Sequence, residues 1–525
     1  MNAIDALTGL IPEELSWLIH SSSNSTYFMY TVAVAIITST AYFVWLIWIH
    51  PLSHFPGPKR AIASNLYWAK QFTSGHSHQS VRSLHHKYGD VVRWGPNELS
   101  FACVDAWKDI YDRRKDGKVL IKDPVFYRKD ETLRAEHIVN AEDPERHAEI
   151  RKMMSYAFSA KALLQQEDLI LQYASELREA IREKGADGPI NLVNFFNWTT
   201  FDILGELAFG EPFGSLKNRK TDSWIAIILD HMQSMAWDAA IWKFPLLHYF
   251  QSWLTPKAVR EGGARHALES KKKILRRERE GPKSDRIDFV SYILKKRDEL
   301  LITDWQLAAH SNALIIAGSE TSATVLSGLF YYLCKHPDVY AKLKDELRSH
   351  FSNANDITAK AAGELPYLTA CISETFRIYP PIPIAMPRVT PEGGCTIAGH
   401  FVPAGVSTRI TLNCPPLKAC KTVVGVHAWS ITHNPKYFRD PDSFRPERWI
   451  EKIDNLEASK PFLTGPRMCM GINMAWIEVR IIAAQLVYMF DFELDDNNFD
   501  WAREQLCYVL WDKPELFVKA KVFSR

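Results

Sequence analysis

The longest uninterrupted run of apolar positions lies near the N-terminus. Residues 27–49 (YFMYTVAVAIITSTAYFVWLIWI) form a stretch of 23 residues without a charge or a histidine. As a helix it measures about 35 Å, which is enough to cross a hydrocarbon core of ~30 Å. Tyrosines and tryptophans stand near both ends, as in the aromatic belts of membrane proteins. The pattern predicts a transmembrane helix, with a buried core helix as the alternative; a cleavable signal peptide is disfavoured because the stretch starts late and follows no basic segment.

Charges on the two sides of this segment predict its orientation. The residues before it include acids but no lysine or arginine, whereas Lys59 and Arg60 follow it. The positive-inside rule places residues 1–26 in the lumen and the rest of the chain in the cytosol, with the endoplasmic reticulum membrane as the expected location. Asn24 begins an Asn-Ser-Thr sequon, too close to the bilayer for modification to be expected. Three prolines and a glycine in residues 50–60 predict a stiff hinge.

Beyond the hinge, residues 61–525 read as one domain without repeats, low-complexity linkers or a second membrane span. The periodicity is mostly helical, with helices predicted at 142–158, 165–183 and 258–279. Two strands around a Gly-Pro turn are predicted within residues 90–101.

The clearest helix of this domain begins at Thr303. Thr303 and Gln306 match a capping box, and apolar positions continue to His336-Pro337, where proline ends the helix. Roughly 32 residues make about 48 Å, which is long enough to cross a domain. Its middle, residues 317–322, reads Ala-Gly-Ser-Glu-Thr-Ser, an unfavourable composition for a helix interior. Either a group approaches the backbone closely there, or the glycine serves packing beside a tolerated polar patch.

Composition narrows the protein class without identifying a function. With 46% hydrophobic and 24% charged residues, the chain is not disordered, collagenous or a disulfide framework. A net charge of +2 creates no global field that would favour nucleic acid as a partner. Eight cysteines without a CxxC pair indicate reduced thiols facing a cytosol. The basic run at residues 271–277 is expected to be a solvated helix face, with contact to anionic lipid as the alternative.

One cysteine lies in a loop whose composition suits a cofactor. Residues 461–471 read PFLTGPRMCMG and lead into an apolar helix. A thiolate just before a helix N-terminus is stabilised by backbone N–H groups and by the helix dipole. Gly465 and Gly471 allow a flat ligand to approach, and Arg467 offers a charge to an anionic group. These features predict a haem held by Cys469, although a lone cysteine is more often a small buried hydrophobe.

This loop and three further motifs resemble those of eukaryotic, membrane-anchored cytochromes P-450, which are haem-thiolate monooxygenases. The similarity extends from the hinge to the C-terminus. The haem-binding signature is matched by Phe462, Gly465, Arg467, Cys469 and Gly471. The other motifs are AGSET at 317–321, ETFR at 374–377 and PERW at 446–449. The resemblance implies a mostly helical, α+β cytochrome P-450 fold with one N-terminal transmembrane helix, and haem b with Cys469 as the axial ligand of the iron.

The resemblance also assigns roles to individual residues. Glu320 and Thr321 supply an acid and a hydroxyl on the distal side of the haem, where protons reach the bound oxygen. Glu374, Arg377 and Arg448 form a buried ion network, in which the loss of one partner is expected to cost ~3–5 kcal/mol. The haem propionates are assigned to His147, Arg151 and Arg388; His147 replaces the tryptophan of the family's WxxxR motif. The substrate pocket is assigned to Asn312, Ala313, Ala317, Ile382, Ile384 and Leu510.

The activity that the resemblance implies is insertion of one oxygen atom into an apolar small molecule, by hydroxylation or epoxidation. No GxGxxG fingerprint follows a strand, so the electrons must come from another protein. NADPH–cytochrome P-450 reductase is the expected partner, with cytochrome b5 as an optional second donor and Arg146, Arg151 and Lys152 as a docking patch. Motif variants and FDILGELAFGEPFG at 201–214 resemble fungal enzymes of secondary metabolism, which favours a terpenoid, polyketide or indole-derived substrate. Alternatives are a reductase-independent isomerase or dehydratase and a non-catalytic haem-binding protein.

A second set of possible metal ligands lies upstream of the cysteine loop. Cys414, Cys420, His427 and His433 loosely imitate a zinc site, but the cysteines are spaced more widely than in typical fingers. Both cysteines belong to residues 406–421, whose removal would leave FVPAGTVVGV, which predicts a continuous hairpin. These 16 residues are either a tolerated surface loop or a retained intron of 48 nucleotides, since Val-Ser can be encoded GTAAGT and a lysine codon can end in AG. We favour the intron hypothesis, under which the zinc site disappears.

Overall fold

The computed structural model describes residues 24–128, 135–244, 247–254, 257–281, 289–405 and 421–524. The chain divides into two compact units, Met1–Phe55 and Pro56–Arg525. Residues 406–420, which contain Cys414 and Cys420, lie outside the described residues, as do residues 1–23 of the expected lumenal segment.

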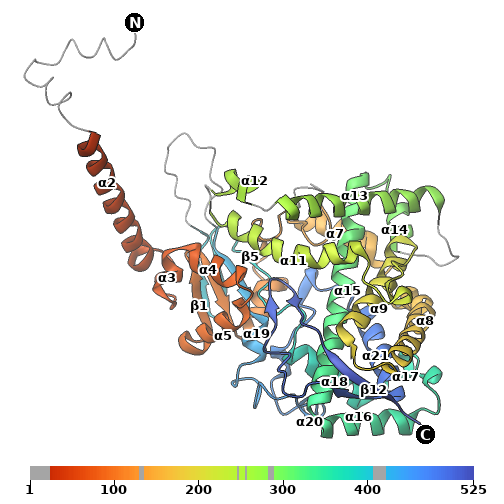
Figure 1. The fold of residues 1–525 in the computed structure, drawn as a ribbon. Coiled ribbons are helices and arrows are strands. Elements are labelled where there is room, and N and C mark those ends of the chain that lie inside the picture. Colours follow the sequence, from red (N-terminus) through yellow and green to blue (C-terminus); the bar gives the residue numbers. More distant parts are fainter. Residues whose placement is uncertain are drawn as a thin grey trace, which may run out of the picture. The chain divides into compact units, whose positions relative to one another are not determined.

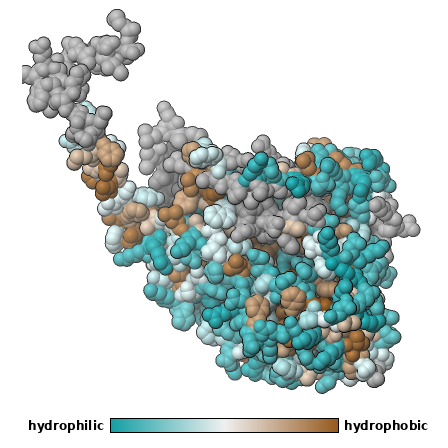
Figure 2. Space-filling view, viewed as in Figure 1, coloured by the Kyte–Doolittle hydropathy of each residue, from teal (hydrophilic) through white to brown (hydrophobic). Residues whose placement is uncertain are grey.

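The first unit contains the apolar helix. Its described part consists of α2 (Asn24–Val44) and a π-helical turn, η2 (Trp45–Ile49). The span Tyr27–Ile49 is long and apolar enough to cross a membrane, and only 6% of it is buried within the structure. Figure 2 shows hydrophobic side chains along this helix. A helix that exposes apolar side chains on all sides fits a membrane anchor, because lipid is the solvent that such a surface requires.

The second unit is mostly helical, as expected. Before the central helix its helices are α3 (Lys59–Ala63), α4 (Asn65–Thr73), α5 (Ser77–Tyr88), α6 (Val104–Tyr111), α7 (Pro144–Ser155), α8 (Ala160–Gly185), α9 (Leu192–Phe209), α10 (Ser215–Asn218), α11 (Ser223–Trp242), η3 (Leu247–Phe250), α12 (Gln251–Leu254), α13 (Lys257–Glu280) and α14 (Phe289–Lys295). From the central helix onward they are α15 (Asp304–Lys335), α16 (Pro337–His350), η4 (Ala354–Asp356), α17 (Ala359–Gly363), α18 (Pro366–Ile378), α19 (Ala428–Thr432), α20 (Glu447–Glu451), η5 (Leu456–Ala458), η6 (Gly465–Arg467) and α21 (Ile472–Met489).

The strands are short. They are β1 (Val91–Gly95), β2 (Glu98–Phe101), β3 (Ile121–Lys122), β4 (Ile190–Asn191), β5 (Arg388–Val389), β6 (Cys395–Ile397), β7 (His400–Val402), β8 (Val423–Val426), β9 (Phe490–Leu494), β10 (Leu506–Cys507), β11 (Trp511–Asp512) and β12 (Phe517–Val522). The largest sheet has the order β1-β2-β8-β5-β3, and β4-β12-β9 form a second sheet.

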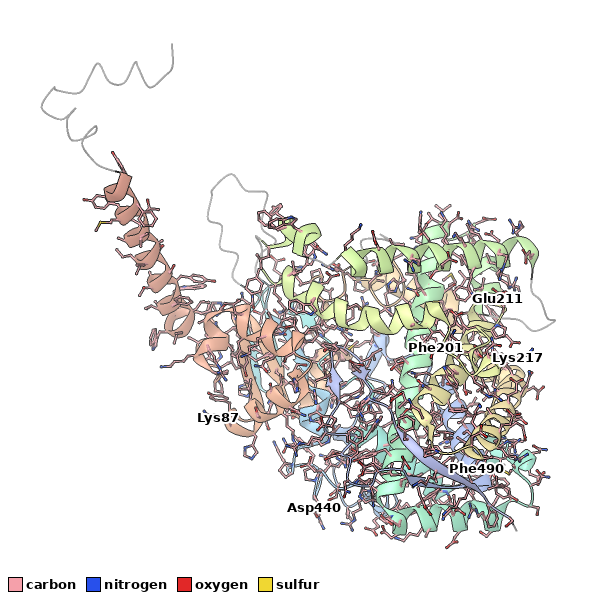
Figure 3. All side chains as sticks on the ribbon, in the orientation of Figure 1. Lys87, Phe201, Glu211, Lys217, Asp440 and Phe490 are labelled. Carbon is pink, nitrogen blue, oxygen red and sulfur yellow. The ribbon has the colours of Figure 1, made fainter. Side chains whose placement is uncertain are left out.

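The central helix α15 organises the second unit, which it crosses from one side to the other (Figure 1). The predicted capping box is present: the Thr303 side chain accepts from the Gln306 N–H, and the Gln306 side chain accepts in return. Helix α9 packs along α15, and a Cβ on Gly318 would lie only 2.9 Å from Cδ1 of Leu204. Gly318 therefore serves close helix packing. Figure 3 shows Phe201 of α9 among the interior side chains, where it is fully buried.

Helices α15 and α21 are also long and apolar enough to cross a membrane, yet most of their residues are buried in the second unit. Their apolar surfaces pack against other helices of that unit, including α9, α18 and each other. Their composition therefore reflects the core of the domain, in agreement with the expectation of a single span.

The hairpin predicted across residues 406–421 is wrong for the described strands. β7 pairs with β6, whereas β8 pairs in parallel with β2 and antiparallel with β5. The residues that flank positions 406–421 on the two sides nevertheless lie close together. The Thr390 hydroxyl lies 3.2 Å from the carbonyl oxygen of Pro403 and 3.3 Å from that of Thr422. Because both carbonyls contact one hydroxyl, the chain on the two sides of residues 406–421 is close enough to be joined directly.

The basic run on α13 is only partly a solvated face. Lys273 and Arg276 form ion pairs with Glu211, and Arg277 is buried, where it donates to the Ser291 hydroxyl (3.0 Å). Lys272 is the member of this run that stays mostly exposed. Tertiary partners therefore neutralise much of this charge, and the expected solvated face is wrong for Lys273 and Arg277.

Candidate active site

The cysteine loop is held by its own backbone. The Cys469 N–H donates to the carbonyl of Phe462 (2.9 Å), and the Met468 N–H donates to that of Gly465 (3.1 Å). Gly465 has a φ of +75°, and a Cβ there would collide with the carbonyl oxygen of Tyr111, so that only glycine fits. The loop ends at Gly471, directly before α21, as the sequence predicted.

Cys469 differs from the other described cysteines in its accessibility. Cys469 is exposed, whereas Cys103, Cys371, Cys395 and Cys507 are buried. Surrounding protein atoms still raise the pKa of the Cys469 thiol, against the opposing effects of a backbone hydrogen bond from Gly471 and of the Arg151 charge. Among the described cysteines, Cys469 is therefore the one placed to bind an atom from outside the chain.

Five basic side chains gather beside this loop: Lys122, His147, Arg151, Arg388 and Arg467. Burial and the charges of the other four lower the pKa of His147 to about 3. Burial and the charges of Arg467 and Arg388 lower the pKa of Lys122 to about 6. These shifts show that the cations repel one another at close range.

No carboxylate forms an ion pair with this cation cluster in the described part of the chain. Its side chains donate to carbonyl oxygens instead: Arg151 to Met468 (2.6 Å) and Arg467 to Ala141 (2.6 Å). Since buried charges are normally paired, the cluster lacks negative charge that an anionic ligand would supply. The cluster and the cysteine loop together suit a ligand that carries both a metal for sulfur and anionic groups.

Lys122 was not predicted from the sequence. It lies on the two-residue strand β3, and the pairing of β3 with β5 sets Lys122 directly opposite Arg388. No motif surrounds it, and a strand of two residues has no detectable periodicity. Only the pairing of strands distant in sequence brings Lys122 to the site.

One face of α15 is open at its middle. Asn312, Ala313, Ala317 and Thr321 are at least partly accessible, whereas Leu314, Ile315, Ser319 and Glu320 are buried. Residues four apart lie on the same face of a helix, so Ala313, Ala317 and Thr321 form one line. The Thr321 hydroxyl donates to the carbonyl of Ala317 (2.6 Å). This line is a small, mostly apolar surface with one hydroxyl.

The other residues predicted for the active site are placed differently. Ile382 is half-buried, whereas Ile384 and Leu510 are buried. Glu320 is buried too, and forms an ion pair with Lys513 that the sequence did not predict. The neighbours Glu320 and Thr321 thus differ: one is buried and paired, and the other reaches the open face.

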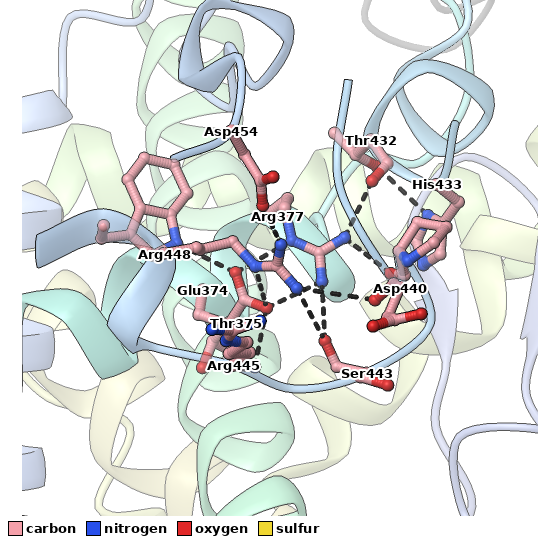
Figure 4. A network of polar contacts seen from close by, with 12 residues as sticks. Glu374, Thr375, Arg377, Thr432, His433, Asp440, Ser443, Arg445, Arg448 and Asp454 are labelled. Atoms are coloured by element: carbon pink, nitrogen blue, oxygen red, sulfur yellow. Dashed lines mark hydrogen bonds and ion pairs between the residues drawn. The ribbon is translucent and has the colours of Figure 1, made fainter. Parts of the chain in front are cut away.

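The ExxR network assembles as expected (Figure 4). Glu374 on α18 accepts from Arg377 (2.8 and 2.9 Å) and from Arg448 of α20 (3.0 Å). The Arg445 N–H and the Trp449 indole N–H, each at 2.9 Å, complete its coordination. Glu374, Arg377 and Arg448 are all fully buried. The network joins α18 to the segment that leads into the cysteine loop.

The two histidines of the zinc hypothesis are occupied by structural contacts. Nδ1 of His427 lies 2.8 Å from the Ser430 hydroxyl. His433 stacks on Trp429, with ring centroids 3.9 Å apart. The described residues contain no cluster of three potential metal ligands. Cys414 and Cys420 lie outside the described residues.

Comparison with known proteins agrees with the fold. Residues 56–519 match the family model "Cytochrome P450". The chain is 39% identical over 506 residues to "Cytochrome P450 monooxygenase ORF11" of Penicillium roqueforti, covering 95% of this chain and 100% of that protein. It is 36% identical over 486 residues to "Cytochrome P450 monooxygenase astJ" of Aspergillus oryzae, covering 91% and 93% of the two chains. The chain belongs to the cytochrome P450 family, and it is a monooxygenase of secondary metabolism whose cofactor is haem iron held by a cysteine thiolate.

Proposed function

We propose that Cys469 is the thiolate ligand of the haem iron and that the cation cluster binds the haem propionates. The observation that carries this assignment is the accessible thiol beside five basic groups that lack a carboxylate partner in the described residues. The donor set fits haem, because sulfur binds the iron and guanidinium groups bind carboxylates in a bidentate manner. The negative charges of the two propionates would then compensate the mutual repulsion within the cation cluster, which consists of Lys122, His147, Arg151, Arg388 and Arg467. Bound haem supplies the oxygen-activating chemistry.

The substrate is an apolar small molecule that the enzyme hydroxylates or epoxidises. Support comes from the open face of α15, where Asn312, Ala313 and Ala317 offer little charge, and from Ile382. A terpenoid, polyketide or indole-derived scaffold suits such a surface. The Thr321 side chain supplies a hydroxyl on this face, and its role is to help deliver protons to the bound oxygen. Related monooxygenases of Penicillium and Aspergillus agree with a place in fungal secondary metabolism.

P450 enzymes generally receive electrons from a reductase. For this chain the donor is NADPH–cytochrome P-450 reductase at the endoplasmic reticulum, with cytochrome b5 as an optional second donor, and residues 27–49 anchor the catalytic domain on the cytosolic side. The docking patch is narrower than the sequence suggested. Arg146 forms ion pairs with Glu136 and Glu149, and Arg151 donates to the cysteine loop. Lys152 is the member left exposed for an acidic partner.

Substitution of the cysteine tests the haem assignment. Cys469→Ser should abolish the Soret band that the reduced, carbon monoxide-bound enzyme shows at the wavelength characteristic of thiolate ligation. Cys334→Ser is the matched control, since Cys334 is half-buried and only approaches the Phe492 carbonyl (3.6 Å). An unchanged band in Cys469→Ser refutes the ligand assignment. Haem-loaded wild type that consumes no NADPH with reductase refutes the monooxygenase mechanism for this chain.

Thr321→Ala tests the proton path. Ser327→Ala is its control, because Ser327 makes the same bond to the carbonyl four residues earlier (2.7 Å) at a buried site on the same helix. Metabolite profiling of the gene deletion identifies the substrate. With that substrate, Thr321→Ala should form product about 10-fold more slowly or worse, while NADPH is still consumed and peroxide accumulates. Coupling at the wild-type level refutes this role.

A further inference from the structure

A buried ion pair joins the central helix to the C-terminal segment. Nζ of Lys513 contacts Oε1 of Glu320 and donates to the hydroxyl of Thr324 over 3.1 Å. Each side chain of the pair is only 3% exposed. The two residues are 193 positions apart in the sequence, so that folding of the whole domain is needed to bring them together.

Lys513 is held in place by its neighbours in the chain. The Trp511 indole donates to the carbonyl of Pro380 (2.8 Å) and stacks on Tyr379, with ring centroids 4.9 Å apart. On the other side, the Trp501 indole donates to the carbonyl of Pro514 (2.9 Å). Anchors on both sides fix the backbone at Lys513, so its ammonium group has a defined position at Glu320.

Glu320 depends on this one cation. In the described part of the chain its other oxygen, Oε2, is buried without a hydrogen-bond partner. Tyr379 is an ionisable neighbour that interacts electrostatically with Glu320, and its hydroxyl donates to Gln505. Burial and the charges of Tyr332 and Glu320 raise the pKa of Tyr379 well above its usual range, so that Tyr379 stays neutral. A carboxylate this deeply buried is ionised only when a cation compensates its charge.

We propose that Lys513 is a positioning residue for oxygen activation: it keeps Glu320 ionised and directs the carboxylate away from the open face on which Thr321 lies. Successive residues of an α-helix project about 100° apart, so the pair fixes Glu320 to the side of that face. In this state the carboxylate takes up a proton supplied by solvent on its buried side and releases that proton toward Thr321, which leaves Glu320 ionised again. This inference rests on the proposed function, because it assumes that oxygen is activated beside Thr321.

Infrared spectroscopy of the holoenzyme tests the charge of Glu320 without turnover. In Lys513→Met the carboxylate loses its cation and should become a neutral acid, which adds a carboxylic acid C=O band to the difference spectrum against wild type. The band should be absent from Lys513→Arg and from the double variant Lys513→Met/Glu320→Gln. Glu478, whose pKa burial raises to about 8, is present in every variant, so its signal cancels in the difference spectrum at a fixed pH. Lys519→Met is the matched control, since Lys519 lies on strand β12 and forms a partly exposed ion pair with Asp495 (2.9 Å).

Turnover gives an independent measurement. NADPH consumption with reductase, without added substrate, should vary little with pH in wild type, in Lys513→Arg and in Lys519→Met. In Lys513→Met it should become pH-dependent and fall as the pH is lowered, because a neutral acid replaces the carboxylate. The double variant should not show this titration, because the titrating group is gone.

The outcomes separate the two proposals. A Lys513→Met holoenzyme with neither the new band nor the new titration overturns the role of Lys513, whether or not the wild type is active. Wild type that loads haem but consumes no NADPH overturns the proposed function, while the infrared result still decides the charge of Glu320. If Lys513→Met yields no holoenzyme, recovery in the double variant supports the pair. Failure of the double variant alongside a stable Glu320→Gln enzyme overturns it.

Discussion

Replacing Glu374 with glutamine should remove the negative charge that holds the ExxR network together. The carboxylate accepts five hydrogen bonds, from the Arg377 and Arg448 side chains, the Arg445 backbone and the Trp449 indole. A glutamine side chain has nearly the same shape, but its NH2 group faces donors and cannot accept. Two fully buried guanidinium groups therefore lose the charge of Glu374 without any change in volume, and Arg448 keeps its second ion pair, with Asp454.

The magnitude follows from the burial of the network. Removing one partner of a buried ion pair costs about 3–5 kcal/mol, because the remaining charge stays in a low-dielectric environment. Unfolding entropy scales as ~2.1 cal/mol/K per residue, so for the second unit, Pro56–Arg525, it is about 1 kcal/mol/K. The melting midpoint should therefore fall by about 3–5 °C at least. Since net stabilities are about 5–15 kcal/mol, a large share of the protein should also fail to retain haem in cells.

The assay compares full-length protein in microsomes. The reduced carbon monoxide spectrum measures holoenzyme, an immunoblot measures total protein, and thermal loss of the spectrum gives the midpoint. Glu364→Gln is the control, because Glu364 is exposed and lies just before α18. Glu374→Gln with the same holoenzyme fraction and midpoint as Glu364→Gln would refute the reasoning.

Three further predictions concern other parts of the chain. Burial raises the pKa of Glu478 from 4.5 to about 8, so the native state keeps a proton that the unfolded state has lost. Its contribution to the free energy of unfolding is complete below about pH 4.5 and is lost as the pH rises toward 8, a total loss of roughly 3–5 kcal/mol. Glu478→Gln should remove this loss, so that the melting midpoint depends less on pH across this range. A pH dependence equal to that of the wild type contradicts this. Deleting residues 1–49 should release the protein from membranes without loss of haem, as judged by sedimentation; undiminished pelleting would show a second membrane contact. Sequencing of cDNA across codons 405–422 should show 48 nucleotides missing, and protein without residues 406–421 should load haem; a transcript that retains all 48 as its only product contradicts the intron hypothesis.

Local patterns in the sequence were sufficient for several elements. The capping box at Thr303 and Gln306 is present, and α15 ends at Lys335, one residue before the expected stop. The two strands around the Gly-Pro turn are also confirmed. These features are encoded by side chains a few residues apart, so that no distant partner is needed to form them.

The errors arose where distant segments meet. The hairpin across residues 406–421 was wrong because β8 pairs with β2 and β5, which is a choice among strands far apart in the chain. The sequence predicted a solvated face for the basic run on α13 because its partner, Glu211, is distant in sequence and lies in the connection between α9 and α10. The sequence shows which side chains are charged, but it does not show which oppositely charged residues pair with them after folding.

The sequence by itself determined the family, the apolar N-terminal helix, the central helix and the cysteine loop, because each rests on contiguous residues whose chemistry is local. Tertiary structure alone decided that Lys122 pairs with Arg388 across two strands, that Glu320 forms an ion pair with Lys513 and that Leu204 packs against Gly318. The physical reason is that burial and low dielectric make these pairings strong only after folding has excluded water. Until then, the same side chains are solvated and independent of one another.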